Sequence, residues 1–233
     1  MLGWIFVDRI MRVVAVAVAS LALISLAQSV TAVPRDSSPM KRILVLGDSL
    51  SAGFGLRPNQ AYPVLLIEKL RAAGLNFEIT SASQSGGTTE GGLRRLPAHL
   101  KRKIDIFVLE LGINDAFRGV PIAEIRNNLQ AIIDTVKARN PNVRIIVSGM
   151  QLPNYTSDDY VFAFGQIYAD LAAKNNAALI PYLLEGVAGD PLLNQPDRVH
   201  PNAAGQKILA ENVWRVLEPI ARDAAAEPSD RVQ

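Results

Sequence analysis

Three residues of this chain have the types and spacing that nucleophilic catalysis requires. Ser49 lies in the segment Gly-Asp-Ser-Leu, and His200 follows Asp197 by three residues. A serine hydroxyl is a weak nucleophile unless a neighbouring base removes its proton, and a histidine ring is such a base when an acceptor holds its second nitrogen. Asp197 is close enough, within one turn, to be that acceptor. We therefore expect Ser49, His200 and Asp197 to be the nucleophile, the base and the orienting acid of a hydrolase.

Two further segments carry groups that stabilise a negatively charged oxygen. Gly86 lies in a glycine-containing turn, and Asn114 follows a glycine at a second turn. Donors that are already in place for the oxygen of a tetrahedral intermediate are worth about 3 kcal/mol of barrier each. We expect the backbone N–H groups of Ser49 and Gly86 and the side-chain amide of Asn114 to form this oxyanion hole. The neighbouring Asp48 and Asp115 are interpreted as local acceptors that shape the turns.

These segments follow predicted strands of an alternating fold. Short β-branched runs predict five strands, and apolar residues at helical spacing predict the helices between them. The expected strands are residues 42–46, 77–80, 105–111, 143–147 and 178–180, and the expected helices are residues 60–73, 122–138, 158–175 and 202–217. Such alternation implies right-handed crossovers and a parallel sheet. We predict an α/β fold, a three-layer α/β/α sandwich around a mostly five-stranded parallel sheet, with the chemistry at the carboxyl ends of the strands.

Taken together, these segments resemble the four sequence blocks of the SGNH, or GDSL, hydrolases. The blocks are residues 47–50, 85–86, 112–115 and 197–200, and the resemblance runs from about residue 41 to residue 217. It is most similar to the bacterial periplasmic acyl-CoA thioesterase/lysophospholipase/arylesterase branch. Gly-Asp-Ser-Leu alone is a weak signal, whereas four blocks in order, each after a predicted strand, are specific. The resemblance implies a flavodoxin-like fold, the triad Ser49–His200–Asp197, and Gly86 and Asn114 as oxyanion donors.

The same resemblance extends to a segment that follows the fourth predicted strand. Leu152, Pro153 and Tyr155 are similar to that branch and are candidate substrate-binding residues. Two positions depart from its pattern. Gly87 stands where the branch often has aspartate, and Ile113 stands where it usually has a small residue. Neither change removes a catalytic group, but both alter the expected wall of the pocket.

The first segment of the chain predicts export. Residues 13–32 contain no charged side chain, and Val30 and Ala32 are small residues at the positions that signal peptidase requires. An uncleaved membrane anchor is the alternative, since about 20 apolar residues can span a bilayer. The expected organisation is a signal peptide at 1–32, a linker at 33–40, a hydrolase domain at 41–220 and a flexible C-terminal tail at 221–233. The protein is accordingly expected to be periplasmic or secreted.

Composition excludes several other classes of site. The 233 residues include no cysteine and two histidines, so a disulfide scaffold, a zinc finger, an iron–sulfur centre and a cysteine nucleophile are ruled out. The formal net charge of +2 is too small for a field that binds nucleic acid across the whole molecule. One basic cluster stands out, formed by Arg94, Arg95, Lys101, Arg102 and Lys103. It is interpreted as a solvated surface, with contact to anionic lipid headgroups as the alternative.

We therefore expect a hydrolase of carboxylic esters or thioesters that works through an acyl-enzyme. The substrate would be a small acyl ester or thioester, and no metal or organic cofactor is required. A monomer is favoured, with at most transient contact to a membrane surface and no nucleic-acid partner. Two alternatives stay open: a carbohydrate acetylesterase with the same site, and an acyl- or lipid-binding module that does not turn over.

Overall fold

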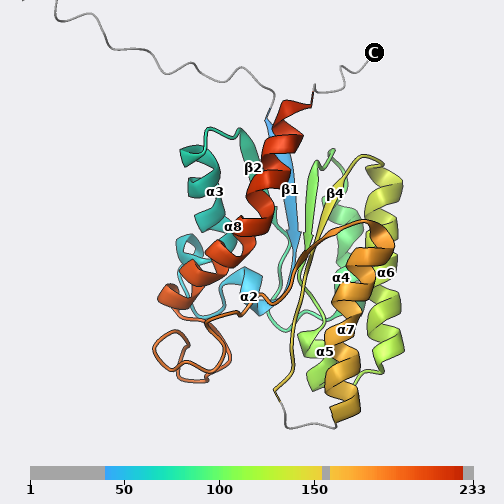
Figure 1. Ribbon diagram of the computed structural model, residues 1–233, viewed down its shortest axis with the longest axis vertical. Coiled ribbons are helices and arrows are strands. Elements are labelled where there is room, and N and C mark those ends of the chain that lie inside the picture. The colour runs from blue at the N-terminus through green and yellow to red at the C-terminus, as the bar shows by residue number, and fades with distance from the viewer. Residues whose placement is uncertain (1–39, 154–157, 228–233) are drawn as a thin grey trace, which may run out of the picture. The chain divides into compact units, whose positions relative to one another are not determined.

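Five parallel strands form the central sheet of the protein (Figure 1). The computed structural model describes residues 40–153 and 158–227, so the expected signal peptide lies outside the described residues. The strands are β1 (Lys41–Leu46), β2 (Phe77–Ser81), β3 (Ile106–Leu109), β4 (Arg144–Ser148) and β5 (Ala178–Ile180). Their order across the sheet is β2-β1-β3-β4-β5. The predicted fold class and all five strands are confirmed.

The register of the sheet brings the carboxyl ends of its central strands level. Leu46 pairs with Leu109, and Leu109 pairs with Val147. The chain passes from β1 to β2 on one side and then returns to place β3 on the other side of β1. Ligands bind outside the carboxyl ends of the strands at such a reversal of strand order. The segments that follow β1 and β3 therefore meet at the position where a site is expected.

Two layers of helices cover the sheet (Figure 1). Helices α3 (Tyr62–Ala72) and α8 (Ala203–Ala226) pack together on one face. Helices α4 (Thr89–Arg95), α6 (Ile122–Arg139) and α7 (Asp158–Asn175) cover the other face. The short elements are α2 (Ser49–Ala52), α5 (Ile113–Phe117) and the 3₁₀ turns η1 (Pro58–Gln60) and η2 (Leu96–His99). β1 and β3 are apolar on both faces because both faces are covered.

Helix α4 has no counterpart among the helices expected from the sequence. Its sequence contains Gly91 and Gly92, and glycine disfavours the interior of a helix. The structure shows why glycine is needed here. A Cβ atom at Gly92 would lie 2.4 Å from Cδ1 of Leu111, so any side chain here would force the buried Leu111 side chain, just after β3, to move.

The C-terminal helix is longer than expected. α8 continues to Ala226, so the prediction of a flexible tail from residue 221 is wrong for residues 221–226. Ala221 and Ala224 are fully buried, because they continue the apolar stripe that includes Leu217. Among the described residues, no helix is long and apolar enough to cross a membrane.

We predict that this last part of α8 contributes to stability. Ala224→Asp places a charge at a site with 0 % exposure, and it should lower the free energy of unfolding by about 3 kcal/mol and the Tm by about 5–10 °C. Ala226→Asp, at an exposed site two residues later, is the matched control and should change the Tm little. Thermal unfolding measures both. Equally small effects of the two substitutions would show that this segment is a tail.

Candidate active site

The predicted nucleophile, base and acid lie in one hydrogen-bonded row. The Oγ atom of Ser49 is 3.0 Å from Nε2 of His200, and Nδ1 of His200 is 2.7 Å from Oδ2 of Asp197. Ser49 follows β1, whereas the other two residues come from the loop that precedes α8. Residues separated by about 150 positions in the sequence are thus brought together in the order that nucleophilic catalysis requires.

Asp197 is held in a tight turn that keeps its carboxylate charged. Its Oδ1 atom accepts hydrogen bonds from the backbone N–H groups of His200 at 3.0 Å and Val199 at 2.9 Å. The hydrogen bond from the His200 backbone is the main reason that the pKa of Asp197 is lowered from 3.8 to about 2. An ionised carboxylate can only accept at Nδ1 of His200. The ring therefore carries its proton on Nδ1 and presents Nε2 as an acceptor to the serine hydroxyl.

Two residues that the sequence analysis did not single out position this turn. Gln195 donates from its side chain to the carbonyl of Phe54 at 2.6 Å, and its backbone N–H donates to the carbonyl of His200 at 2.7 Å. The ring of Phe54 packs against the ring of His200, with centroids 4.6 Å apart. These contacts connect the histidine loop to the segment after Ser49. Neither the residue types nor their spacing predicts this role, because the contacts depend on how two loops that are distant in the sequence meet.

Ser49 is presented at the start of a very short helix. Asp48 is its N-cap, and its Oδ1 atom accepts from the backbone N–H of Leu50 at 2.9 Å. A Cβ atom at Gly47 would lie 2.4 Å from Oγ of Ser51 and 2.6 Å from Oε2 of Glu110. Only glycine fits between β1 and the nucleophile, which explains the first residue of the Gly-Asp-Ser-Leu segment.

The three expected oxyanion donors lie in the segments that follow β1, β2 and β3. Nδ2 of Asn114 donates to Oδ2 of Asp48 at 3.0 Å and to the carbonyl of Gly87 at 3.1 Å. Both partners are acceptors, so the amide can face them only with its nitrogen. Gly86 has a φ of 71°, a left-handed conformation that suits glycine. Within the described part of the chain, the backbone N–H groups of Ser49 and Gly86 have no acceptor, so both are available to a ligand.

A buried carboxyl group, that of Glu110, lies against the turn that carries Ser49. Its Oε2 atom accepts from the backbone N–H of Asp48 at 3.1 Å and from Oγ of Ser51 at 2.6 Å. The Ser51 hydroxyl also lies 2.7 Å from the hydroxyl of Tyr62. Oε1 of Glu110 has no hydrogen-bond partner among the described residues. The available sequence signal for this site was an acidic residue inside the otherwise apolar end of the expected strand at residues 105–111.

Burial favours the protonated forms of the two neighbouring acids. It is the main cause that raises the pKa of Glu110 well above 4.5, and the nearby charge of Asp48 adds to the effect. Burial also raises the pKa of Asp48 from 3.8 to about 6, although the hydrogen bond from Leu50 opposes it. Two buried carboxyl groups this close resist carrying two negative charges. We therefore assign the neutral form to Glu110 and the charged form to Asp48 at neutral pH.

The second and third loops of the site are joined by another buried carboxylate. Asp115 accepts from the backbone N–H of Thr89 at 2.9 Å and from its Oγ1 at 2.6 Å. Thr89 begins α4, which follows the Gly86 turn, and Asp115 lies beside Asn114 in α5. Asp115 is thus a local hydrogen-bond acceptor, as the sequence predicts.

Two of the three candidate substrate-binding residues lie among the described residues, and they differ in exposure. Leu152 is buried in the core with 6 % exposure, whereas Pro153 is exposed. Tyr155 lies outside the described residues. Across the described ranges, no group of three or more histidine, aspartate or glutamate side chains is arranged to hold a metal ion.

Comparison with known proteins agrees with this geometry. The family model described as GDSL-like lipase/acylhydrolase matches residues 45–208. The chain belongs to this family. It is 39 % identical over 201 residues to esterase TesA of Pseudomonas aeruginosa, which covers 86 % of this chain and 95 % of that protein. It is 36 % identical over 179 residues to thioesterase 1/protease 1/lysophospholipase L1 of Escherichia coli K12, covering 76 % of this chain and 84 % of that protein.

A solved structure of TesA has the same fold. It superimposes with a TM-score of 0.74 at 39 % identity and covers 77 % of this chain and 99 % of the TesA chain. The SGNH/GDSL resemblance predicted from the sequence is thereby confirmed. This GDSL hydrolase is a serine ester/thioester hydrolase, and its reaction class is carboxylic ester hydrolysis.

We predict a pH-dependent stability cost from Glu110. The unfolded chain releases this proton near pH 4.5, whereas the folded protein retains it at higher pH. Unfolding then releases a proton, so this group lowers stability as pH rises above 4.5, by up to about 1.4 kcal/mol per pH unit. Glu110→Gln cannot titrate and should become more stable relative to the wild type as pH rises.

Urea unfolding of both proteins at a series of pH values measures this difference. Glu124→Gln, at an exposed site on α6, is the control for loss of a carboxylate. A difference between Glu110→Gln and the wild type that stays constant with pH would contradict a retained proton on Glu110.

Proposed function

We propose that Ser49, His200 and Asp197 form the catalytic triad of this hydrolase and that the reaction passes through an acyl-enzyme. The observation that carries the proposal is the continuous row of hydrogen bonds from the Ser49 hydroxyl through the His200 ring to the Asp197 carboxylate. Each member of the row has the partner that its chemical role needs. Asp197 orients the ring, and the ring receives the serine proton.

The proposed reaction has two matched halves. Ser49 Oγ bonds to the acyl carbonyl carbon while its proton moves to Nε2 of His200. The intermediate collapses, the bond to the alcohol or thiol breaks, and His200 returns the proton to the leaving group. Water then attacks the acyl-enzyme, again with His200 as the base, and the acid departs from a restored Ser49. No step requires a metal or an organic cofactor.

The oxyanion of both intermediates would be held by Ser49 N–H, Gly86 N–H and Nδ2 of Asn114. The two backbone groups have no competing acceptor in the described residues. Both N–H bonds of the Asn114 amide are in use, one to Asp48 and one to the carbonyl of Gly87, so the amide would release Gly87 and donate that N–H to the oxyanion while Asp48 keeps it in place. Donors that are already aligned in the folded protein lower the barrier most, because no free energy is needed to reorient them during the reaction. We propose that Asp48 is a positioning residue for Asn114 in this way.

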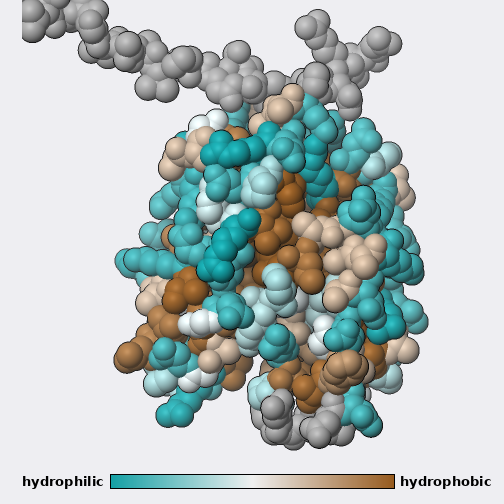
Figure 2. Space-filling model, in the orientation of Figure 1, coloured by the Kyte–Doolittle hydropathy of each residue, from teal (hydrophilic) through white to brown (hydrophobic). Residues whose placement is uncertain are grey.

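Exposed apolar side chains in the segments that follow the carboxyl ends of the strands support an acyl substrate, and we call them the apolar rim. Figure 2 shows hydrophobic side chains reaching the surface at the lower end of the view, the end at which α2 and α5 lie. Five of the six most exposed large hydrophobic side chains of the described residues follow the carboxyl ends of strands: Phe54, Phe117, Phe162, Leu192 and Val199. Such side chains favour an apolar ligand. We propose a small acyl ester or thioester, with Leu152, Pro153 and Tyr155 contributing to the pocket.

The cellular location and assembly complete the proposal. The uncharged segment at residues 13–32, which ends in small residues, favours cleavage at residue 32 and release into the periplasm or beyond. The hydrogen-bonded row uses residues of a single chain, so a monomer suffices for the chemistry.

Substitution of Ser49 separates the catalytic serine from its neighbours. On p-nitrophenyl esters from acetyl to palmitoyl, Ser49→Ala should lose several orders of magnitude in kcat, and Asn114→Ala about 10²–10³-fold, because one oxyanion donor is removed. Ser81→Ala, at an exposed serine that ends β2, is the matched control. Near-normal turnover by Ser49→Ala would refute the triad.

The chain-length profile of the same series separates the candidate substrates. A preference for acetyl esters together with activity on acetylated sugars would favour a carbohydrate acetylesterase. Acyl binding without turnover by a folded sample would favour the binding-module alternative.

An asparagine substitution tests the positioning role of Asp48. Its two carboxylate oxygens accept from Leu50 and from Asn114, and an asparagine offers one acceptor oxygen. Asp48→Asn should therefore lower kcat about 10–100-fold with little change in KM, since the loss falls on the transition state. Steady-state kinetics on one ester measures the split. A raised KM with unchanged kcat would mean that Asp48 shapes substrate binding instead.

A further inference from the structure

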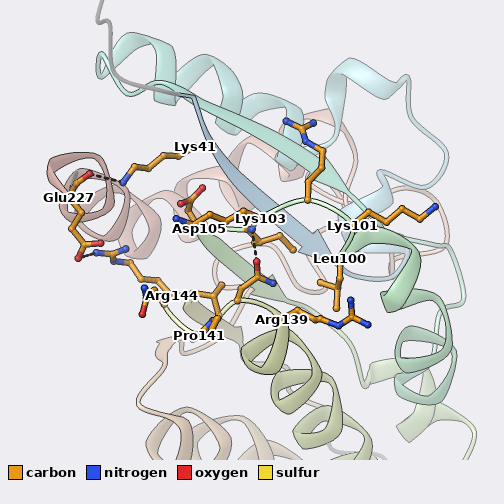
Figure 3. A pocket seen from close by; sticks show the side chains of 14 residues that line it. Lys41, Leu100, Lys101, Lys103, Asp105, Arg139, Pro141, Arg144 and Glu227 are labelled. Atoms are coloured by element: carbon orange, nitrogen blue, oxygen red, sulfur yellow. Dashed lines mark hydrogen bonds and ion pairs between the residues drawn. The ribbon is translucent and has the colours of Figure 1, made fainter. Parts of the chain in front are cut away.

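A concave surface lies at the amino ends of the strands (Figure 3). Ser49 follows the carboxyl end of β1, at the opposite edge of the sheet. It encloses about 480 Å³ and is formed by the first residues of β1 and β4, the loop before β3 and the ends of α6 and α8. Six cations line it: Lys41, Lys101, Arg102, Lys103, Arg139 and Arg144. Its lining includes two acids, Asp105 and Glu227. We call this surface the basic edge.

The acidic side chains near the basic edge already have partners within the protein. Glu227 pairs with Arg144 at 2.5 Å, and its backbone carbonyl accepts from Lys41 at 3.1 Å. Asp105 accepts from a backbone N–H, and Arg102 pairs with Glu78 on β2 at 2.9 Å.

Two exposed cations remain uncompensated. The side chains of Lys101 and Arg139 have no ion pair or hydrogen bond to any residue that the structure describes. The lining residues carry a surplus of four positive charges, which exceeds the net charge of +2 for the whole chain. The positive charge is therefore concentrated at this edge, where a negatively charged partner would be attracted.

The arrangement of the cations indicates which kind of anionic partner would bind. They come from four separate segments and surround the surface rather than converging on one point, as Figure 3 shows for Lys101 and Arg144. A single small anion is held by donors that converge, whereas an array of anionic headgroups is held by charges spread over a surface. The lining includes no aromatic side chain on which a nucleic-acid base would stack.

The spread of positive charge over this edge is complementary to a surface that carries many negative charges. We propose that the basic edge binds the surface of an anionic phospholipid membrane. This inference is independent of the catalytic proposal, because none of the residues involved belongs to the active site.

The proposal fixes an orientation for the enzyme. β1 is six residues long, so the basic edge and the catalytic edge are about 20 Å apart at opposite ends of the sheet. An enzyme bound through the basic edge holds Ser49 away from the lipid and takes its substrates from the aqueous side. Binding through the apolar rim would place Ser49 against the lipid instead.

Vesicle binding by the exported chain tests the proposal. Ser49→Ala is used as the background so that no lipid is hydrolysed. The protein should sediment with vesicles of phosphatidylcholine and phosphatidylglycerol in equal parts, and high salt should release it. The double variant Lys101→Gln/Arg139→Gln should bind about 30-fold more weakly, at about a fivefold loss per charge. The double variant Arg57→Gln/Lys207→Gln removes equal charge away from the basic edge and should bind as the background does.

Three outcomes would overturn the proposal. Equal binding to pure phosphatidylcholine vesicles would indicate insertion of an apolar segment rather than charge attraction. Equal weakening by both double variants would indicate a response to net charge alone. Displacement of the protein from vesicles by a low concentration of inorganic pyrophosphate would indicate a small-anion site.

A pair of fluorescent labels tests the orientation separately. The chain has no cysteine, so Asn142→Cys at the basic edge and Asn59→Cys near the catalytic edge each provide one labelling site. An environment-sensitive dye at position 142 should report contact with lipid, and a dye at position 59 should not. The reverse pattern would show that the apolar rim is the surface that binds.

Discussion

The buried carboxyl groups of Glu110 and Asp48 hold the turn of Ser49 and the Asn114 amide in a single arrangement. Glu110 accepts from the backbone of Asp48 and from Ser51, and Asp48 accepts from Leu50 and from Asn114. These hydrogen bonds connect the turn after β1 to the turn after β3. Burial of two acids is costly, and the cost is reduced because they do not both carry charge and because most of their oxygens have donors. Without this pair, Ser49 and the Asn114 amide would be fixed only by the segments to which they belong.

The parallel sheet supplies the rest of the arrangement. Its level carboxyl ends bring Gly47 beside Glu110, and Asp115 joins the second loop to the third through Thr89. His200 arrives from the opposite end of the chain and is held by a different set of contacts. Gln195 and the Phe54 ring fix its loop to the segment after the nucleophile. His200 is thus aligned by contacts between loops, whereas the Asn114 amide is aligned by hydrogen bonds to the turn that carries Ser49 and to Gly87.

The sequence predicts the parts of this molecule that depend on local pattern. The apolar runs predict all five strands, and the four polar blocks that follow them predict which side chains meet. Contacts between distant segments are not predictable in this way. Glu110 becomes a support for Asp48 only when β1 and β3 pair, and Gln195 matters only because its loop reaches Phe54. The extent of α8 was underestimated because the alanines at its end look like weak core residues until the surface that covers them is known.

Trapping the enzyme with an alkyl phosphonate ester tests the arrangement of the active site most directly. The phosphonyl group mimics the tetrahedral intermediate, and its position can be determined by mass spectrometry of the adduct and by crystallography. The structure described here predicts an adduct on Oγ of Ser49, with a phosphoryl oxygen within hydrogen-bond distance of Ser49 N, Gly86 N and Nδ2 of Asn114. Attachment at another side chain, or a phosphoryl oxygen directed away from Gly86 and Asn114, would contradict the account.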